Sequence, residues 1–431
     1  MKKSVSILIF VFLVNFKNSY SQSIMDLVPL SQVTHTAQIS GDWDDPTTWG
    51  GSVPNNGAKV HIPGSIIVTL NDIISQRIKT LRIDGKLIFK TNVNTELKVE
   101  TIVGGINGEL KIGDLTNPID QTVKAKITII DEGAIDLYTD YEQYSKGIIM
   151  MGKTTAYGVE KTSWCSLQNA PLAGDNTIIL SQPVNNWEIG DEIVITGTKY
   201  DDPESDEKRT IDAINGLVIT LNQPLLMDHN TPSSQLKVHV ANLSRNIIFS
   251  SENNVISRRG HVMFMHNLDV DLNYVRFYQL GRTNKRIQLD DWYFPTLIAD
   301  DYYAGSRTNI RGRYSCHFHR GGVDPAVTIA ATVKGCVVED DPGWAYVNHS
   351  SNVNFIENVS YNVVGGAFQT ESGDEIGSFR RNIAIRTVNP DYPILNFYTE
   401  PVDIREETQD FAFQGDAFWF HGGGVSIVDN I

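Results

Sequence analysis

The sequence predicts an all-β protein built largely from a parallel β-helix, and three observations lead to this. Helical periodicity is nearly absent beyond the first residues. Short β-branched runs such as "KVHIPGSIIVTL" and "KTLRIDGKLIF" alternate with Gly, Asn and Asp turns. Comparable strands begin at Val333, Phe355 and Phe379, which are 22 and 24 residues apart. A repeat of this length, with Asn and Gly at its corners, is typical of a β-helix.

Residues 1–21 have the pattern of a signal peptide. Lys2 and Lys3 precede the apolar run "SILIFVFLVNF", and small residues at Ser19 and Ser21 predict cleavage before Gln22. The apolar run is too short to cross a bilayer comfortably. We therefore expect a secreted or cell-surface protein with no membrane span in the mature chain.

The charge of the chain bears on its partners. The formal net charge is −15, and it becomes −18 when the three lysines of the leader are removed. An acidic protein is a poor binder of nucleic acid or anionic membrane. Residues 257–322 nevertheless carry ten Lys and Arg against six Asp, together with four of the ten histidines. This local excess favours a site for an anionic ligand, the alternative being chance clustering on a solvated face.

Three segments follow the leader. Residues 39–151 are rich in glycine and short strands, residues 162–240 resemble a small β barrel or sandwich, and residues 242–431 carry the β-helix repeat. The sequence stops at "FWFHGGGVSIVDNI" without a capping element, which solenoids need. We therefore expect a β-helix that is truncated at the C-terminus.

The three cysteines, Cys165, Cys316 and Cys336, are too few and too odd in number for a disulfide framework. Cys316 and Cys336 are 20 residues apart, which would place them on neighbouring coils. We expect both to be buried thiols that behave as small hydrophobic side chains.

The stretch "RGRYSCHFHRGG" is the strongest candidate for a site. Read as a strand, it places Tyr314, Cys316 and Phe318 on one face and Arg313, His317 and His319 on the other, with Arg320 just beyond. Imidazoles can move protons near neutral pH, and guanidinium groups pair with carboxylates. His317 and His319 are therefore candidate acid/base groups, and Arg313 and Arg320 are candidate ligands of an acidic substrate.

Several longer stretches resemble one family. "WDDPTTWGGSVPNNGAKVHIPGSIIVTL" and "GGINGELKIG" are similar to a G8 domain. "NWEIGDEIVITGTKYD", "RYSCHFH" and "VNHSSNVNFIENVSYNVVGGAFQTESGDE" then follow in the order found in proteins that join a G8 domain to a β-helix. That family includes a cell-migration-inducing hyaluronan-binding protein and a transmembrane cell-surface hyaluronidase. The resemblance covers nearly the whole mature chain and implies a right-handed, pectin-lyase-like parallel β-helix.

In the hyaluronidase members the resemblance also implies depolymerisation of hyaluronan outside the cell. The chain departs from the family at "QTESG", where relatives tend to have a "TEDG"-like run. Glu371 matches the glutamate of this run, but Ser372 stands where the relatives tend to have a second acid.

Glycosidic cleavage usually requires carboxylic acids. Glu371 is the first candidate, Asp374 and Glu375 lie just beyond it, and we expect His349 on the same face one or two coils away. Trp292 and Tyr302, in the long segment 287–309, are candidates for stacking on sugar rings. Asp340, Asp341 and Asp374 could bind Ca²⁺, although an Asp–Asp turn before Pro342 is the simpler interpretation.

These features favour a secreted protein that binds an acidic polysaccharide such as hyaluronan and cleaves it as a glycoside hydrolase. Two alternatives remain open. A lyase would neutralise the uronate carboxylate and abstract the adjacent proton with a base such as histidine. A non-catalytic carbohydrate-binding or adhesion module would carry the same face without cleavage.

Overall fold

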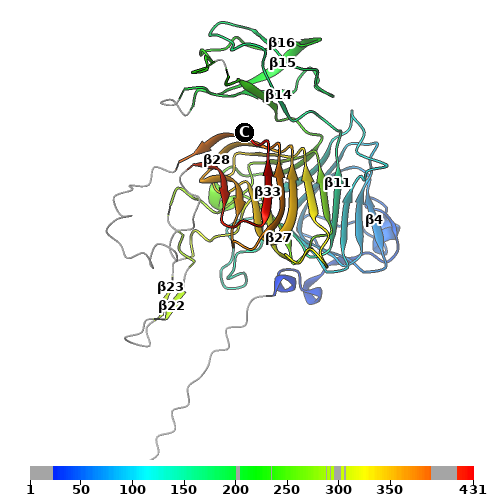
Figure 1. The fold of residues 1–431 in the computed structure, drawn as a ribbon. Helices are drawn as coiled ribbons and strands as arrows, with labels where there is room; N and C mark the ends of the chain where they lie inside the picture. The colour runs from blue at the N-terminus through cyan, green and yellow to red at the C-terminus, as the bar shows by residue number, and fades with distance from the viewer. Residues whose placement is uncertain are drawn as a thin grey trace, which may run out of the picture.

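The computed structural model describes residues 23–199, 204–233, 235–287, 289–291, 293–295, 302–304, 307–389 and 415–431. The expected leader, its cleavage site before Gln22 and Trp292 lie outside the described residues. Within the described part, the chain is almost entirely β-structure, and a long parallel β-helix carries a smaller antiparallel domain on one side (Figure 1). None of the helices in the described part is long and apolar enough to cross a bilayer.

Three stacks of parallel strands form the walls of the β-helix, and three long strands turn a corner and contribute to two stacks each. The first stack contains β1 (His35–Thr36), β3 (Lys59–Ile62), the second half of β5 (Ile73–Ile83), the second half of β7 (Thr95–Gly104), β10 (Gly147–Met150), β19 (His261–Met265), β24 (Cys316–Gly322), the first half of β27 (Tyr346–Ile356), β29 (Gly366–Thr370) and β32 (Asp416–Phe420).

The second stack contains β2 (Gly41–Asp42), β4 (Ile67–Leu70), β6 (Lys86–Phe89), β8 (Glu109–Ile112), β11 (Lys153–Tyr157), β20 (Val270–Asn273), β25 (Ala331–Lys334), the second half of β27, β30 (Ile376–Arg380) and β33 (Val425–Val428). The third contains the first halves of β5 and β7, then β9 (Ala125–Ile129), β18 (Ile247–Ser251), β21 (Val275–Tyr278), β26 (Val337–Glu339), β28 (Val359–Val364) and β31 (Ile383–Val388).

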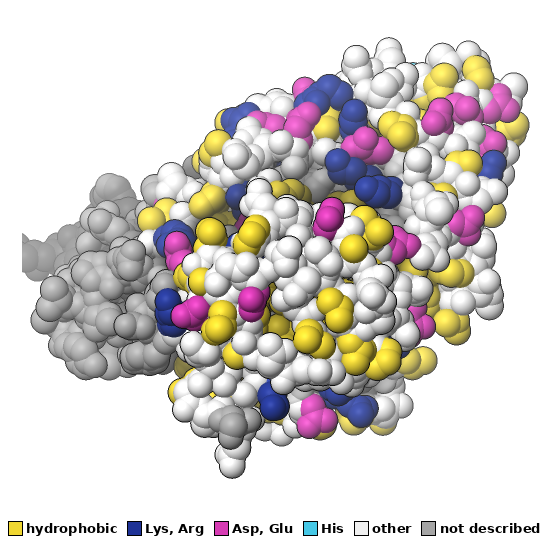
Figure 2. Space-filling model, turned by 90° about the horizontal axis from the view of Figure 1, so that it is seen from above, with side chains coloured by type: hydrophobic (Ala, Val, Ile, Leu, Met, Phe, Trp, Pro, Cys, Tyr) yellow, Lys and Arg dark blue, Asp and Glu magenta, His cyan; other side chains and the backbone are white. Residues whose placement is uncertain are grey.

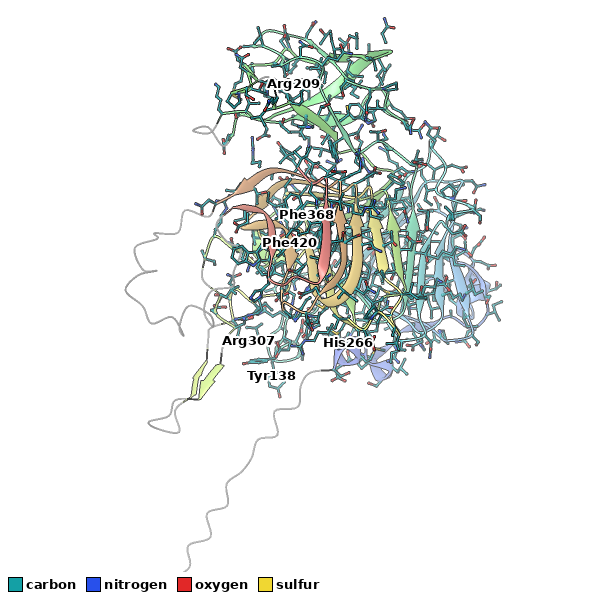
Figure 3. The ribbon with its side chains drawn as sticks, viewed as in Figure 1. Tyr138, Arg209, His266, Arg307, Phe368 and Phe420 are labelled. Atoms are coloured by element: carbon teal, nitrogen blue, oxygen red, sulfur yellow. The ribbon has the colours of Figure 1, made fainter. Side chains whose placement is uncertain are left out.

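Inward-pointing side chains of all three stacks form one core. Val333 pairs with Phe355 and Phe355 with Phe379 on successive coils, so the predicted repeat is confirmed residue by residue. Phe368 and Phe420 fill the same interior (Figure 3). Cys316 and Cys336 are free and buried in this core, as expected. Burial of these alternating apolar residues holds the coils together.

This core runs from Ala37 to Phe379 without a break. Residues 39–151 and 242–431, which the sequence separates into a glycine-rich domain and a β-helix, therefore belong to one continuous solenoid. In Figure 1 the strands follow one another side by side from β4 near the N-terminus to β33 near the C-terminus. The first segment supplies the earliest coils of the same helix.

The segment between β11 and β18 folds separately. It forms a six-stranded antiparallel sheet in the order β12 (Trp164–Ser166), β17 (His239–Asn242), β14 (Glu192–Ile195), β15 (Glu207–Asn215), β16 (Val218–Leu221) and β13 (Thr177–Ile179). A bridge between Leu167 and Leu180 connects its two edges, and a core of its own lies inside. This small domain rests on the outer face of the third stack, where Val194 and Leu243 pack with Val337 and Val359.

The corners of the β-helix repeat as regularly as its strands. Asn358, Asn382 and Asn430 lie one above another at the corner that leads into the third stack. Each amide Nδ2 donates to a carbonyl of the preceding coil, and each Oδ1 accepts from the backbone of a neighbouring coil. We refer to these three residues as the asparagine ladder.

The outer face of the first stack changes character along the axis. Two short 3-10 helices near the N-terminus, η1 (Ile24–Leu27) and η2 (Leu30–Gln32), precede β1, and Ile24 and Val28 pack against Met263 and Met265 on this face. Two further 3-10 turns, η3 (Pro46–Trp49) and η4 (Ile256–Arg258), and a hairpin of β22 (Tyr293–Pro295) with β23 (Tyr302–Ala304) complete the fold. On the next coil, Met263 and Met265 are followed in register by His317 and His319.

Candidate functional site

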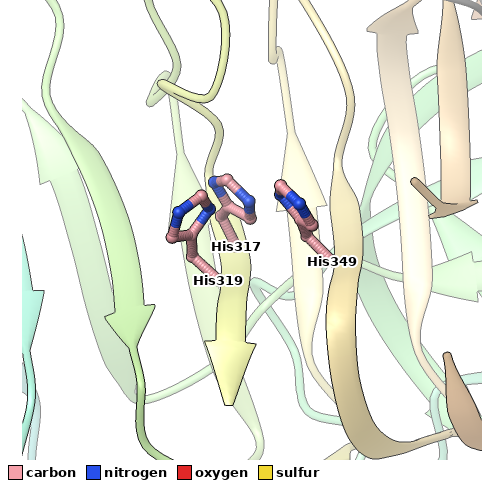
Figure 4. Close-up of side chains that lie close together, drawn as sticks. All are labelled: His317, His319 and His349. Atoms are coloured by element: carbon pink, nitrogen blue, oxygen red, sulfur yellow. The ribbon is translucent and has the colours of Figure 1, made fainter. Parts of the chain in front are cut away.

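Three histidines gather on the outer face of the first stack. His317 and His319 come from β24 and His349 from β27 on the next coil (Figure 4). The His319 and His349 ring centroids are 4.6 Å apart, and the His317 and His349 rings stack at 6.1 Å. Glu371, one coil further, brings an Oε2 atom within 3.2 Å of His349 Nδ1 and 3.8 Å of His317 Nε2. We refer to these four residues as the histidine cluster.

Local sequence explains why the four side chains converge. His317 and His319 are two residues apart on one strand, so they share a face. His319 and His349 pair directly across neighbouring strands, and each is followed by a left-handed residue, Arg320 at φ 53° and Ser350 at φ 46°. The chain therefore bends at the same place on successive coils.

Four buried polar atoms of the cluster make no hydrogen bond of good geometry: His317 Nε2, His319 Nδ1, His349 Nδ1 and Glu371 Oε2. Two of them, His349 Nδ1 and Glu371 Oε2, contact one another as an ion pair at 3.2 Å. Such an atom costs about 1–3 kcal/mol when it is left unpaired. In the described part of the chain, the three imidazoles are also the one group of at least three His, Cys, Asp or Glu side chains placed to share a metal ion, with donor atoms within 4.8 Å of one another. The arrangement has the composition of a ligand-binding centre.

The environment shifts the pKa values of the histidines in different directions. Burial, followed by the charges of neighbouring groups, lowers the pKa of His319 to about 3 and that of His317 well below its usual value. Burial also opposes charge on His349, but its contact with Glu371 outweighs this and raises its pKa. Both shifts favour the neutral imidazole at His317 and His319, and their role as acid/base groups stays a prediction.

The turn that carries Glu371 is held by Glu375. This buried carboxylate accepts hydrogen bonds from the backbone amides of Ser350, Glu371, Ser372 and Gly373, at 2.6–3.1 Å. Glu375 is therefore occupied by the scaffold and positions Glu371. Asp374 is exposed on the same turn and is not among the groups that contact the three imidazoles.

Arg313, a candidate for binding the substrate, is placed differently from the expectation. The strand begins only at Cys316, so Arg313 does not share its alternation. Its guanidinium is buried, donates to the carbonyls of Gln143, Arg311 and Glu142, and lies over the ring of Tyr144. Arg313 therefore fastens a loop and does not face solvent. Tyr314 likewise packs outside the β-helix core, stacked on Trp344.

The local excess of positive charge is mostly structural. Arg258 pairs with Asp131, Arg276 with Glu192 and Glu339, Arg307 with Glu142 and Arg311 with Asp291. Arg282 is buried against four backbone carbonyls. Arg320 differs because it is exposed at the corner beside His319, where it contributes to the low pKa of that imidazole.

The proposed Ca²⁺ ligands do not come together. Asp340 and Asp341 lie between β26 and β27, whereas Asp374 lies between β29 and β30, at a different corner of the coil. Asp341 is buried and accepts backbone hydrogen bonds from Ser315 and Gly343, both at 2.8 Å, and burial raises its pKa to about 7. The turn before Pro342 is the correct interpretation of this pair.

Two predicted aromatic contacts stay untested. Trp292 lies outside the described residues, and Tyr302 is described only as part of the backbone of β23. Arg307 and Tyr138, which are described nearby, lie with His266 along the side of the β-helix opposite the small domain, which Arg209 marks (Figure 3).

A cavity of about 470 Å³ between the small domain and the β-helix is the main rival site. Four of its charged residues form ion pairs: Lys161 with Asp191, and Arg276 with Glu192. Seen from above, basic and acidic side chains are interspersed over the molecule and histidine is almost absent (Figure 2). We therefore interpret this region as a contact between the two domains and not as a ligand site.

Comparisons with known proteins show what the chain is similar to. The G8 domain family model matches residues 48–168. This part of the chain is therefore similar to a G8 domain. A G8 domain-containing protein of Dictyostelium discoideum is 28% identical over 355 residues, covering 78% of this chain and 28% of that protein. Fibrocystin-L of Mus musculus is 26% identical over 374 residues, covering 80% of this chain and 9% of that protein.

The chain spans less than a third of the length of these two relatives. Among solved structures, a tailspike of Acinetobacter baumannii bacteriophage AP22 in complex with a capsular saccharide matches 72% of this chain and 48% of that chain, with 10% identity and a TM-score of 0.20. The tailspike of Pseudomonas phage LKA1 matches 76% and 43%, with 12% identity and a TM-score of 0.20. The fold described above rests on strand register and not on these matches.

The sequence predicted His349 on the same face as His317 and His319, one or two coils away, and the structure places it on the next coil. It did not predict that Glu371 reaches this group. The missed signal was the coil length. His319 and His349 are 30 residues apart because β25 and β26 lie between them, which makes one complete coil.

Proposed function

We propose that this protein binds an acidic polysaccharide of the hyaluronan type along the outer face of the first stack and hydrolyses it there. The observation that carries the proposal is the histidine cluster, in which one carboxylate stands among three imidazoles on a partly open face. The His349 and Glu371 side chains are 14% and 13% exposed, whereas His317 forms the buried floor.

A row of side chains along the axis supports the proposal. Met265, His319 and His349 pair in register on successive coils, and Glu371 and His421 each follow the last paired residue of β29 and β32. Parallel strands are about 4.8 Å apart, so this row extends for roughly 19 Å along the axis. A linear polysaccharide lying along the axis would contact several of these side chains together.

Glu371 and Arg320 supply the chemistry. Hydrolysis adds a hydroxyl to the anomeric carbon and a proton to the departing sugar oxygen, so it needs a group that moves a proton. Glu371 is the carboxylate that touches the imidazoles, and Glu375 fixes its turn. The exposed guanidinium of Arg320, beside His319, is placed to pair with a uronate carboxylate.

The proposal is tested by mixing purified protein with long hyaluronan and following chain length by gel and unsaturated uronate by ultraviolet absorbance. We expect shortening without absorbance, loss of shortening in Glu371→Gln, and no loss in Asp374→Asn, which changes an exposed acid on the same turn. Shortening with absorbance would mean a lyase. Binding without shortening would leave a carbohydrate-binding module.

A further inference from the structure

We propose that His317, His319 and His349 together bind one divalent transition-metal ion, such as Zn²⁺, with the Glu371 carboxylate facing the remaining coordination position. The inference rests on the geometry of the histidine cluster. It would stand even if the protein only bound its polysaccharide.

Three unpaired nitrogen atoms of the histidine cluster lie close to one another. His317 Nε2, His319 Nδ1 and His349 Nδ1 are buried and make no hydrogen bond of good geometry, and the three imidazoles bring donor atoms within 4.8 Å of one another. Three imidazole nitrogens plus an open position form a ligand set used by catalytic zinc sites. A bound ion would satisfy all three atoms at once, as hydrogen bonds satisfy the amides of the asparagine ladder.

A hydrogen bond to the backbone already orients the imidazole of His317. The second ring nitrogen of His317, Nδ1, lies 2.9 Å from the carbonyl oxygen of Gly312, so it carries the hydrogen and Nε2 presents a lone pair. Such an outer hydrogen bond is the usual way in which proteins orient a metal-binding imidazole.

The distances between the donor atoms can be compared with those of a zinc site. Zinc–nitrogen bonds of about 2.0–2.1 Å place the nitrogens of a tetrahedral site roughly 3.3 Å apart. The observed limit of 4.8 Å closes to that value by side-chain rotation, because the strand backbones already hold the three residues on adjacent positions of one face. Glu371 Oε2, at 3.2 Å from His349 Nδ1, is near enough to act on a water bound at the open position.

The donor set also selects the class of metal. Imidazole nitrogen suits zinc, copper, nickel and iron, whereas calcium and magnesium prefer oxygen ligands. Because the acidic residues expected to hold Ca²⁺ lie at different corners, the histidine cluster replaces them as the candidate metal centre.

The experiment measures metal directly. Purified protein is stripped with a chelator, titrated with Zn²⁺, and analysed for bound metal after dialysis; Co²⁺ then serves as a spectroscopic probe of tetrahedral coordination. We expect one equivalent of Zn²⁺ per chain, visible Co²⁺ absorption bands, and a higher melting temperature with Zn²⁺ but not with Ca²⁺.

Variants locate the site. Removing an outer partner of a metal ligand typically costs 10–100-fold in affinity, so removing a ligand should cost more than about 100-fold. We expect this in His319→Ala and His349→Ala, and in the bulkier His319→Gln should the alanine variant not fold. His266→Ala is the matched control, because its exposed ring is 6.1 Å from His319 but outside the group, and it should bind within about twofold of the parent.

Glu371→Gln separates this inference from the proposed function. We expect it to retain Zn²⁺ and the Co²⁺ bands while losing cleavage. A folded parent protein that binds no Zn²⁺, or that binds it equally well after His319→Gln and His349→Ala, would overturn the metal site. Absence of hyaluronan cleavage in a protein that holds Zn²⁺ would overturn only the proposed function.

Discussion

The asparagine ladder and the histidine cluster are two groups of buried polar side chains on the same coils, and they are treated in opposite ways. Each amide of the ladder is fully used: Asn382 Oδ1 accepts from Asn358, and its Nδ2 donates to Phe355 and Asn430. In the cluster, four ring and carboxylate atoms are buried and make no hydrogen bond of good geometry. Buried polar groups therefore serve two purposes in this β-helix.

The difference separates structure from function. A polar group whose hydrogen bonds are complete stabilises the corner that it spans, whereas a group left unpaired costs free energy unless a ligand completes it. We interpret the ladder as the fastening of the solenoid and the cluster as a site that the solenoid holds in place.

The largest expected effect is on the ladder. Asn382→Ala should lower the free energy of unfolding by about 4 kcal/mol, because it leaves the Phe355 carbonyl and the backbone N–H of Asn358 without these partners and removes one of the two acceptors of Asn358 Nδ2. Urea denaturation followed by circular dichroism measures this. Asn354→Ala is the control, because that side chain has one hydrogen bond, to Ser378, and should cost less than about 1 kcal/mol. If both variants lost the same free energy of unfolding, the asparagine ladder would contribute no more to stability than a single-bonded amide.

Arg313→Ala should come next, with a loss of about 3 kcal/mol. Its buried guanidinium donates to three loop carbonyls, which would lose their donor. The melting temperature reports the change. If Arg313→Ala weakened hyaluronan binding at unchanged stability, Arg313 would be a substrate ligand after all.

Lowering the pH should reduce the free energy of unfolding of the metal-free protein, because His319 is buried as a neutral imidazole. The folded pKa of His319 is about 3, below its unfolded value near 6.5, so the unfolded state binds more protons and stability falls as pH drops below 6.5. At pH 5 the loss from His319 should be about 2 kcal/mol. His319→Gln should show this much less loss between pH 7 and pH 5 by urea denaturation. Parallel pH profiles would contradict the neutral, buried imidazole.

The smallest effect on stability is expected at Arg320. Arg320→Ala should change the free energy of unfolding by less than about 0.5 kcal/mol, because the side chain is exposed. Hyaluronan affinity, measured by calorimetry, should nevertheless fall, and Arg320→Lys should restore part of it. Unchanged affinity in Arg320→Ala would place the anion elsewhere.

The β-helix could be predicted because its signals are local and periodic. The spacing of Val333, Phe355 and Phe379 predicts the length of one coil, and the structure pairs these residues in that order. The continuity of residues 39–151 with the later coils was not predicted, because strand pairing across the inserted small domain leaves no mark on either segment.

The site was predicted only in part. His317, His319, His349 and Glu371 were selected by residue type and strand alternation. Their convergence depends on coil lengths that loops vary, such as the 30 residues between His319 and His349. Arg313 was misassigned because its neighbours Gln143 and Glu142 approach from a distant loop, and alternation along one strand carries no information about that cover.

The way in which the small domain leaves and rejoins the solenoid bears on how such proteins can be rebuilt. The Val159 amide at its exit donates to the Asn246 side chain at its return, at 2.9 Å. The two ends of the insertion are therefore already joined at its base, while β9 pairs with β18 and β11 with β20 beneath it. A short linker from Val159 to Asn246 could therefore replace the insertion at its base, but removing the insertion would expose Val337 and Val359, which Val194 and Leu243 now cover. A different domain spliced into the same opening would have to bring an apolar face of its own.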